Sequence, residues 1–258
     1  MGDRLAGRVV AVVGATAGIG LATAKLCAQE GAQVVMMARG KDRLEELAGS
    51  LGAFPVACDV SDPTSVRTAF KAIEDRFGTL NALINVAGVA RIRTIEDSSD
   101  EDIQFVFGVN LLGPIYTTRS AVPLMRKAGG GDIINVSSEI TTDYMPMMVL
   151  YGASKGGLDS FSTMMVHELK EHNIRVGLYV SGAVDTEFAS NFTMEEMEAA
   201  FPVWQASGYL SRVAGPGMPA EWMAEAFLFQ LTRPAGQMID KIHVRSFSPE
   251  MAIPTKSV

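Results

Sequence analysis

The chain has little cysteine and no excess of positive charge. Its two cysteines, Cys27 and Cys58, are too few for a disulfide scaffold and indicate a reducing compartment. Lys and Arg total 22 while Asp and Glu total 29, which leaves a net charge of −7. Because nucleic acids and anionic membranes are bound by basic surfaces, this balance argues against both as partners.

A long, uninterrupted apolar run is also missing. Residues 9–24 carry no charge, but this stretch is shorter than the roughly 20 apolar residues that a membrane span requires. It is broken by Gly14, Gly18 and Gly20, which an export signal does not need. With 48% hydrophobic and 20% charged residues, the chain can form a core and is not expected to be disordered. We expect a soluble, cytoplasmic, globular protein.

Apolar runs rich in β-branched residues alternate with helical stretches along the chain. The expected strands are residues 8–13, 33–37, 54–57, 80–85, 132–137, 174–180 and, more weakly, 238–244. The expected helices are residues 18–30, 41–51, 62–77, 99–127, 151–172 and 220–232. Such alternation is typical of βαβ crossovers, whose parallel strands are buried on both faces. We therefore predict an α/β fold, a single-domain doubly wound (Rossmann) parallel sheet of about seven strands with helices on both faces, over residues 1–258.

Two local patterns refine this expectation. Ser98 and Glu101 have the spacing of a capping box, so we expect the helix 99–127 to begin beside them. Residues 184–218 break the alternation with a long segment rich in Met, Phe, Trp and Tyr. Because long connections in compact domains are usually functional loops, we predict a substrate lid at about residues 187–215. The alternative is that these side chains pack against the body or a neighbouring subunit.

A glycine-rich loop follows the first expected strand. Gly14, Gly18 and Gly20 are spaced G-x-x-x-G-x-G and lead directly into a helix. Glycines at this junction let the backbone approach a pyrophosphate, whose charge is stabilised at the helix N-terminus. The position after the first strand favours a nucleotide site over a simple turn.

A second cluster carries acid–base chemistry. Tyr151 and Lys155 lie four residues apart, on one face of an expected helix. A nearby cation stabilises a phenolate and lowers its pKa, which suits tyrosine to proton transfer at neutral pH. Ser138 lies at the end of an expected strand, where ligands bind in doubly wound sheets. A Tyr–Lys pair on a solvated helix face is the simpler alternative.

These features together resemble the short-chain dehydrogenase/reductase family, in its compact single-domain form, over about residues 5–245. The motifs that carry the resemblance follow one another at the family's spacing: Gly14-x-x-x-Gly18-Ile19-Gly20, Cys58-Asp59-Val60, Asn85-Val86-Ala87-Gly88, Asn110, Ser138, Tyr151-x-x-x-Lys155 and Gly182-x-Val184-x-Thr186. The chain departs from the family's pattern at Val13, Val86 and Ser181, and near its end at Ile242-His243-Val244-Arg245.

The resemblance implies a dinucleotide-binding oxidoreductase that transfers a hydride between a nicotinamide cofactor and a carbonyl or secondary alcohol. In that family's mechanism Tyr151 would be the general acid–base, and Lys155 would lower its pKa and hold the nicotinamide ribose. Ser138 would hold the substrate oxygen, and Asn110 would anchor a water in a proton relay. The cofactor-binding residues implied are Gly14, Thr16, Gly18, Ile19, Gly20, Arg39, Asp59, Val60, Asn85, Ala87, Gly88, Tyr151, Lys155, Gly182, Val184 and Thr186. The family also implies a homo-oligomer, a tetramer or a dimer.

One alternative function keeps the same fold. A dinucleotide-binding regulator without catalytic activity would also carry the glycine loop, because a fold does not fix a function. The intact set of Ser138, Tyr151 and Lys155 argues against it, since a regulator has no need of a tuned phenol.

Residues after the second strand favour NADP(H), although NAD(H) remains possible. An NAD-binding chain carries an acidic residue where Ala38 stands, to accept the ribose hydroxyls. Arg39 follows, and its guanidinium suits a phosphate in charge and geometry. Arg43 could assist or could be a solvated surface charge, and Arg39 itself could be only an exposed loop residue.

The remaining patterns concern the substrate and metals. The aromatic and methionine-rich lid segment predicts a bulky, largely apolar substrate. His167 and His172 are five residues apart, whereas a zinc site on one helix face needs a spacing of four. We therefore expect no metal site.

Overall fold

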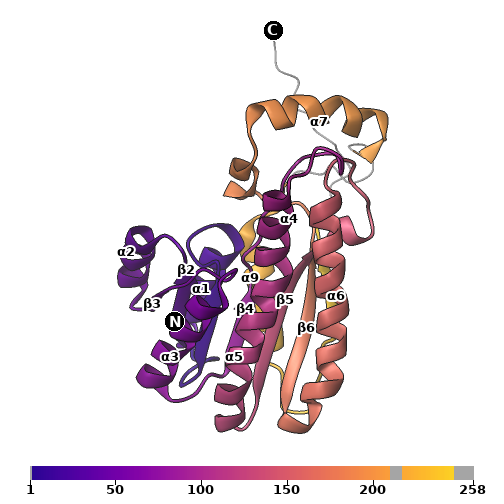
Figure 1. The fold of residues 1–258 in the computed structure, drawn as a ribbon. Coiled ribbons are helices and arrows are strands. Elements are labelled where there is room, and N and C mark those ends of the chain that lie inside the picture. Colours follow the sequence, from indigo (N-terminus) through magenta and orange to yellow (C-terminus); the bar gives the residue numbers. More distant parts are fainter. Residues whose placement is uncertain (1, 210–216, 247–258) are drawn as a thin grey trace.

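The computed structural model describes residues 2–209 and 217–246. Seven parallel strands form one sheet in the order β3-β2-β1-β4-β5-β6-β7 (Figure 1), which confirms the predicted doubly wound Rossmann fold. The strands are β1 Val9–Val13, β2 Gln33–Ala38, β3 Phe54–Ala57, β4 Ala82–Asn85, β5 Gly131–Ser138, β6 Ile174–Ser181 and β7 Lys241–Val244. The helices are α1 Gly18–Gln29, α2 Lys41–Leu51, α3 Pro63–Phe77, α4 Asp100–Phe107, α5 Gly113–Lys127, α6 Val149–Leu169, α7 Met194–Ala206 and α9 Ala220–Leu231.

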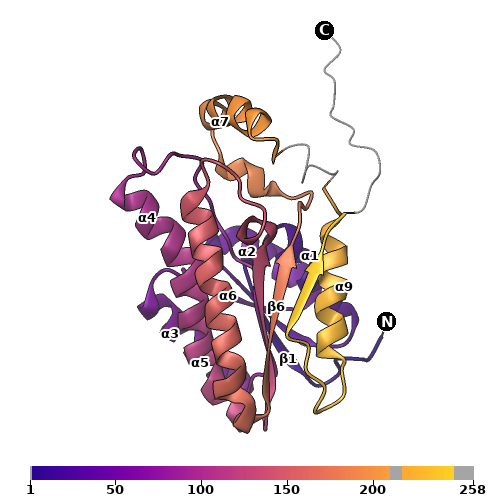
Figure 2. The same ribbon diagram turned by 90° about the vertical axis from the view of Figure 1, so that its right-hand side faces the viewer.

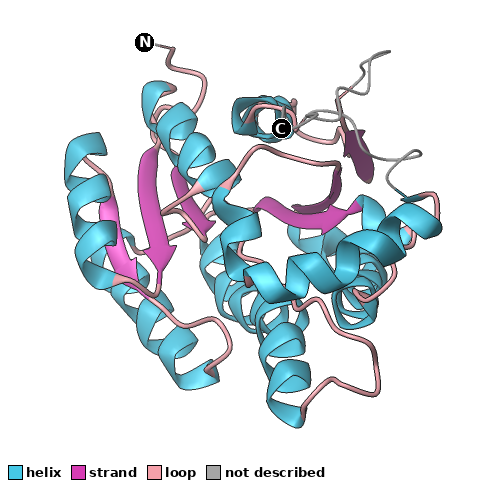
Figure 3. Cartoon of the chain, turned by 90° about the horizontal axis from the view of Figure 1, so that it is seen from above, coloured by secondary structure: helices cyan, strands magenta, loops and turns pink. Residues whose placement is uncertain are grey.

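The sheet is buried on both faces because successive residues of each central strand face opposite helix layers. Val13 packs in the core beneath α3 and α5, whereas Val12 packs in the core beneath α1 and α9. Figure 2 shows the two helix layers on opposite sides of the strands, and Figure 3 shows them from above. This double burial explains why β1 reads as a continuous apolar run, VVAVV, rather than an alternating one.

The strand order reverses between β1 and β4. The connections after β1 and after β4 therefore leave on opposite sides of the sheet, which opens a crevice at their carboxyl ends. The glycine loop follows β1 and the segment Val86–Gly88 follows β4, so both predicted cofactor motifs lie at this crevice.

The expected helix 99–127 is interrupted. It consists of α4, a π-helical turn over Gly108–Leu112, and α5. Its capping box is made by Ser99 and Asp102, one residue later than predicted from Ser98 and Glu101. Both pairs have the required spacing, and the sequence alone did not distinguish them.

The predicted lid segment contains regular structure that the sequence pattern missed. A short 3-10 turn at Glu187–Asn191 is followed by α7, which begins with a capping box between Thr193 and Glu196. Residues 210–215 of the predicted lid lie outside the described residues. No helix in the described part of the chain is long and apolar enough to cross a membrane.

Candidate active site

The glycine loop brings the β1–α1 junction against the segment that follows β4. Gly14 has a φ of +84°, and a Cβ added there would lie 2.8 Å from the backbone nitrogen of Ala87. Only glycine fits this combination of positive φ and close backbone approach. Helix α1 begins at Gly18 with no side-chain cap, so its N-terminal N–H groups remain available to an anion. Gly20 is buried behind the loop, where an added Cβ would meet the Gly14 oxygen at 2.1 Å.

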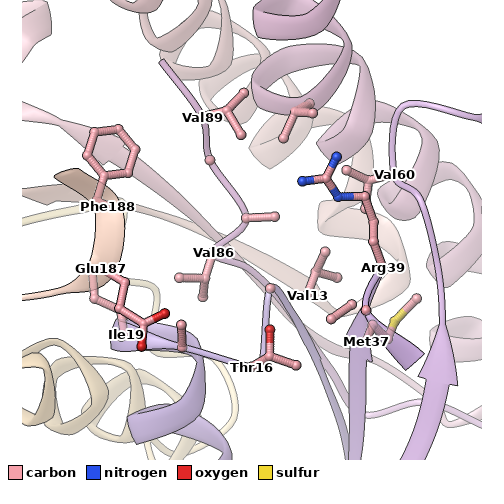
Figure 4. A pocket seen from close by; sticks show the side chains of 18 of the residues that line it. Val13, Thr16, Ile19, Met37, Arg39, Val60, Val86, Val89, Glu187 and Phe188 are labelled. Atoms are coloured by element: carbon pink, nitrogen blue, oxygen red, sulfur yellow. The ribbon is translucent and has the colours of Figure 1, made fainter. Parts of the chain in front are cut away.

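This junction forms one end of a cleft of about 720 Å³ (Figure 4). Most of the predicted cofactor-binding residues line it, namely Gly14, Thr16, Gly18, Ile19, Arg39, Asp59, Val60, Ala87, Gly88 and Thr186. The open helix N-terminus and the glycine contacts fit the pyrophosphate of a dinucleotide, and the cleft lining extends from Arg39 after β2 to Thr186 after β6.

Arg39 and Asp59, two charged residues that line the cleft, interact electrostatically. Asp59 Oδ1 accepts hydrogen bonds from the backbone and hydroxyl of Ser61, at 2.9 and 2.6 Å. Burial opposes ionisation of Asp59, but these hydrogen bonds and the charge of Arg39 lower its pKa below the ordinary value. Arg39 is solvent-exposed and also lines the cleft (Figure 4), so its guanidinium is available to a ligand there.

A second cavity of about 470 Å³ lies beside the cleft. Its polar lining includes Ser138 at the end of β5 together with Tyr151 and Lys155 on α6. Gly182 and Val184 line it as well. Ile19, Gly88 and Thr186 line both spaces, so a ligand in the cleft would meet a ligand in the cavity at these residues.

Burial controls the protonation of the tyrosine–lysine pair. Desolvation raises the pKa of Tyr151 to about 12, and a hydrogen bond with the Ser138 side chain opposes this rise. Desolvation lowers the pKa of Lys155 to about 8, and the charge of Asp159 opposes that change. The net change in the Tyr151 pKa is therefore upward, because desolvation outweighs the contact with Ser138. The Lys155 ammonium group donates to the Val136 carbonyl at 2.7 Å and lies 5.8 Å from the centre of the tyrosine ring.

Side chains from the described part of the predicted lid segment line the second cavity. Phe188, Phe192, Met197, Trp204 and Tyr209 line the cavity, whereas Met194 and Phe201 are exposed. The rings of Phe188 and Tyr151 are 5.7 Å apart. Several side chains of this segment therefore face the cavity, and Trp204 also packs on the body of the protein.

Two contacts attach α7 to the body of the protein. The Trp204 indole donates to the Pro146 carbonyl at 2.8 Å. At the other end of the helix, Glu196 forms an ion pair with Arg93 at 3.4 Å. These contacts hold α7 against the body beside the cavity that Tyr151 lines.

Comparisons with known proteins agree with this geometry. The short chain dehydrogenase family matches residues 8–197. Carbonyl reductase family member 4 from Danio rerio is 33% identical over 237 residues, which cover 90% of this chain and 95% of that protein. The 3-oxoacyl-(acyl-carrier-protein) reductase from Bos taurus is 33% identical, covering 76% of this chain and 84% of that protein. The structure of L-sorbose reductase from Gluconobacter frateurii with NADPH and L-sorbose has a TM-score of 0.80 and 30% identity, covering 95% of this chain and 97% of that one.

The chain belongs to the short-chain dehydrogenase family. It is an oxidoreductase that acts on a carbonyl or alcohol substrate with a nicotinamide cofactor, rather than a regulator on the same fold.

Three of the predicted residues of this dehydrogenase, Gly20, Asn85 and Asn110, are buried and line neither space. Asn110 lies in the π-helical turn, fully buried, where its side chain donates to the Val89 carbonyl at 2.8 Å and accepts from the Val89 nitrogen at 2.9 Å. Asn85 donates to Asn135 at 2.8 Å and accepts from Thr117 at 2.8 Å. Asn110 therefore fixes the backbone beside Gly88, and Asn85 joins β4 to β5 and α5.

The dehydrogenase also carries charged residues at the site that the motifs did not identify. Glu139, next to Ser138, is buried at the cavity and bonds His243 of β7 at 2.7 Å. The departure from the family pattern at Ile242–Arg245 was the only sequence feature that pointed to His243. That His243 pairs with Glu139, 104 residues away, could not be predicted from the sequence. Among the described residues no group of three or more His, Cys, Asp and Glu side chains is placed to bind a metal ion.

Proposed function

We propose that the protein is an NADP(H)-preferring carbonyl reductase or secondary alcohol dehydrogenase that uses Ser138, Tyr151 and Lys155. The observation that carries the proposal is the pairing of the Ser138 and Tyr151 side chains inside a cavity that adjoins the cofactor cleft. A carbonyl oxygen placed between two hydroxyl groups is both oriented and polarised for reduction.

The proton transfer follows from this pairing. The phenol of Tyr151 keeps its proton at neutral pH because burial raises its pKa to about 12. It would therefore act as the general acid in the reductive direction, while Ser138 holds the substrate oxygen. The bound cofactor would supply the hydride. Lys155, held by Val136, would place its positive charge beside Gly88, where the two spaces meet. That charge would stabilise the phenolate left after proton transfer.

The cofactor preference rests on the residues at the end of β2. Ala38 offers no carboxylate to bind ribose hydroxyls or to repel a phosphate, and Arg39 lines the cleft beside it. L-sorbose reductase, the solved relative described above, binds NADPH.

The cavity favours a bulky, largely apolar substrate held under the lid. Its walls include Met145, Met148, Phe188 and Trp204, side chains that offer a large apolar surface.

The exposed apolar residues Met164 and Val149 on α6 belong to the surface through which we expect copies of the chain to associate.

The test is oxidation of NADPH by the purified protein with a panel of ketones, repeated with Tyr151→Phe. The phenylalanine ring keeps the packing with Phe188 but has no exchangeable proton. Turnover should fall by about 10²–10⁴-fold, while the dissociation constant for NADPH changes little. A variant that retains more than about a tenth of the wild-type rate would remove Tyr151 from the proposed role.

A further inference from the structure

An ion pair outside the family motifs joins the two sides of the cofactor cleft. Arg43 lies in the first turn of α2, and Glu187 begins the turn that follows Thr186. The Arg43 guanidinium donates to the Glu187 carboxylate, with 3.1 Å between Nη2 and Oε1. These residues are 144 positions apart, so their contact depends entirely on the fold.

The ion pair connects segments from opposite sides of the cleft. Arg39 and Gly40, immediately before α2, line one side of the cleft, and Thr186 and Glu187 line the other. Figure 4 shows Arg39 and Glu187 on opposite sides of the pocket, with Thr16 of the glycine loop between them. The contact from Arg43 of α2 to Glu187 therefore joins the segments that line the two sides of the cleft.

We propose that Arg43 and Glu187 form a clasp that retains the nicotinamide dinucleotide in the cleft. The inference rests on the proposed function only in requiring that a dinucleotide binds there. A cofactor beneath the clasp can leave only when the ion pair separates. The clasp thus limits the rate of release, whereas the glycine loop and Arg39 provide the binding contacts.

Charge explains why the clasp needs both members. Glu187 places a carboxylate on the wall of a cleft that receives phosphate groups, and a carboxylate alone would repel them. Arg43 compensates this charge. Both side chains are more than half exposed, at 55% and 61%, so water competes for them and the pair opens readily enough to admit the cofactor.

The test measures the release rate of NADPH and of NADH by stopped-flow displacement, following the fluorescence of the bound dihydronicotinamide. Arg43→Gln and Glu187→Gln should each raise the release rate about two- to fivefold, the range expected for an exposed ion pair. The double variant should be no faster than the faster of the two single variants, because both substitutions remove the ion pair. The reversed pair, Arg43→Glu with Glu187→Arg, should return the release rate to within about twofold of wild type.

A matched control is available on the same helix. Lys41→Gln removes another exposed positive charge from α2, but Lys41 pairs with Glu45 on its own helix at 3.8 Å. The rate at which this variant releases NADPH should match that of the wild type. The comparison distinguishes loss of the ion pair from a general loss of positive charge on α2.

Three results would overturn the clasp: unchanged release in both single variants, additive effects in the double variant, or tighter dinucleotide binding in Glu187→Gln. The last result would mean that Glu187 only repels the cofactor. The release rates of both cofactors are measured without turnover, so they test the clasp independently of the catalytic proposal. A wild-type preference for NADH would contradict the proposed NADP(H) preference, but the clasp would still stand or fall on the release rates of the variants.

Discussion

Lys155 donates a hydrogen bond to the Val136 carbonyl oxygen at 2.7 Å, which anchors its ammonium group to β5. Only 3% of the Lys155 surface is exposed, so the ammonium group is largely desolvated. Its pKa falls to about 8 for this reason, while burial raises that of Tyr151 to about 12. Lys155 is therefore the member of the pair whose charge changes close to neutral pH.

We predict that reduction weakens above about pH 8 through Lys155. Below this pH the lysine is protonated and can stabilise the phenolate, and above it the positive charge is lost. Asp159 raises the lysine pKa, so Asp159→Asn should move the descending limb of the kcat/KM profile towards lower pH. Profiles of NADPH-dependent reduction from pH 6 to about 10 would measure the shift.

The matched control for this prediction is Glu168→Gln, an exposed carboxylate on the same helix. Its profile should coincide with that of the wild type. If the limb in Asp159→Asn stayed in place or moved to higher pH, Lys155 would not be the titrating group.

The sequence motifs predicted which segments meet in the fold where each motif belongs to the end of one strand. Gly14 follows β1, Gly88 follows β4 and Ser138 ends β5, so the parallel topology brings them together at one edge of the sheet. Strand positions could be predicted because buried parallel strands are continuous apolar runs.

The features that the sequence did not predict depend on contacts between distant segments. Burial raises the pKa of Tyr151, whose ring lies beside that of Phe188 from a distant segment. The sequence spacing between Tyr151 and Lys155 carries no information about this burial. The role of Asn110 likewise depends on Val89, 21 residues away, and on a π-helical turn without a sequence signature of its own.

Asn110→Ala should reduce stability as well as activity. The Val89 nitrogen and carbonyl oxygen would both lose their partner in a buried environment, at a cost of about 1–3 kcal/mol for each group. Urea denaturation should show the lower free energy of unfolding directly. A variant with wild-type stability and no activity would instead support a purely catalytic role for Asn110, such as the water relay that the family resemblance implies.

Trp204→Phe should loosen the lid selectively. The substitution keeps an aromatic ring against Ala90 and Met148 but removes the hydrogen bond to the Pro146 carbonyl. Loss of about 1 kcal/mol corresponds to about a fivefold rise in KM for bulky ketones, which need the closed lid. Efficiency on small ketones should change less.

Trp222→Phe is the control for the lid variant, because Trp222 is a half-exposed residue of α9 outside the cavity. This variant should keep the wild-type KM for both small and bulky ketones. The lid interpretation fails if Trp204→Phe changes KM equally for small and bulky ketones, or if wild-type enzyme is as efficient on small polar ketones as on polycyclic ones.

The identity of the preferred cofactor should change with two adjacent residues. Arg39→Ala removes the guanidinium from the cleft and should raise the KM for NADPH about ten- to a hundredfold, because a hydrogen bond to a charged group contributes about 1.5–3 kcal/mol. The KM for NADH, which has no 2′-phosphate, should change little.

Ala38→Asp is the complementary change at the end of β2. A carboxylate there would accept hydrogen bonds from the ribose hydroxyls of NADH and repel the phosphate of NADPH, so both effects favour NADH. The measurement is kcat/KM for each cofactor with one fixed ketone. Arg67→Ala, an exposed arginine on α3 that bonds Thr64 of its own helix, is a control for loss of positive charge and should keep the wild-type preference. A higher kcat/KM for NADH than for NADPH in the unmodified enzyme would contradict the assignment of Arg39, since the guanidinium would then have no phosphate to bind.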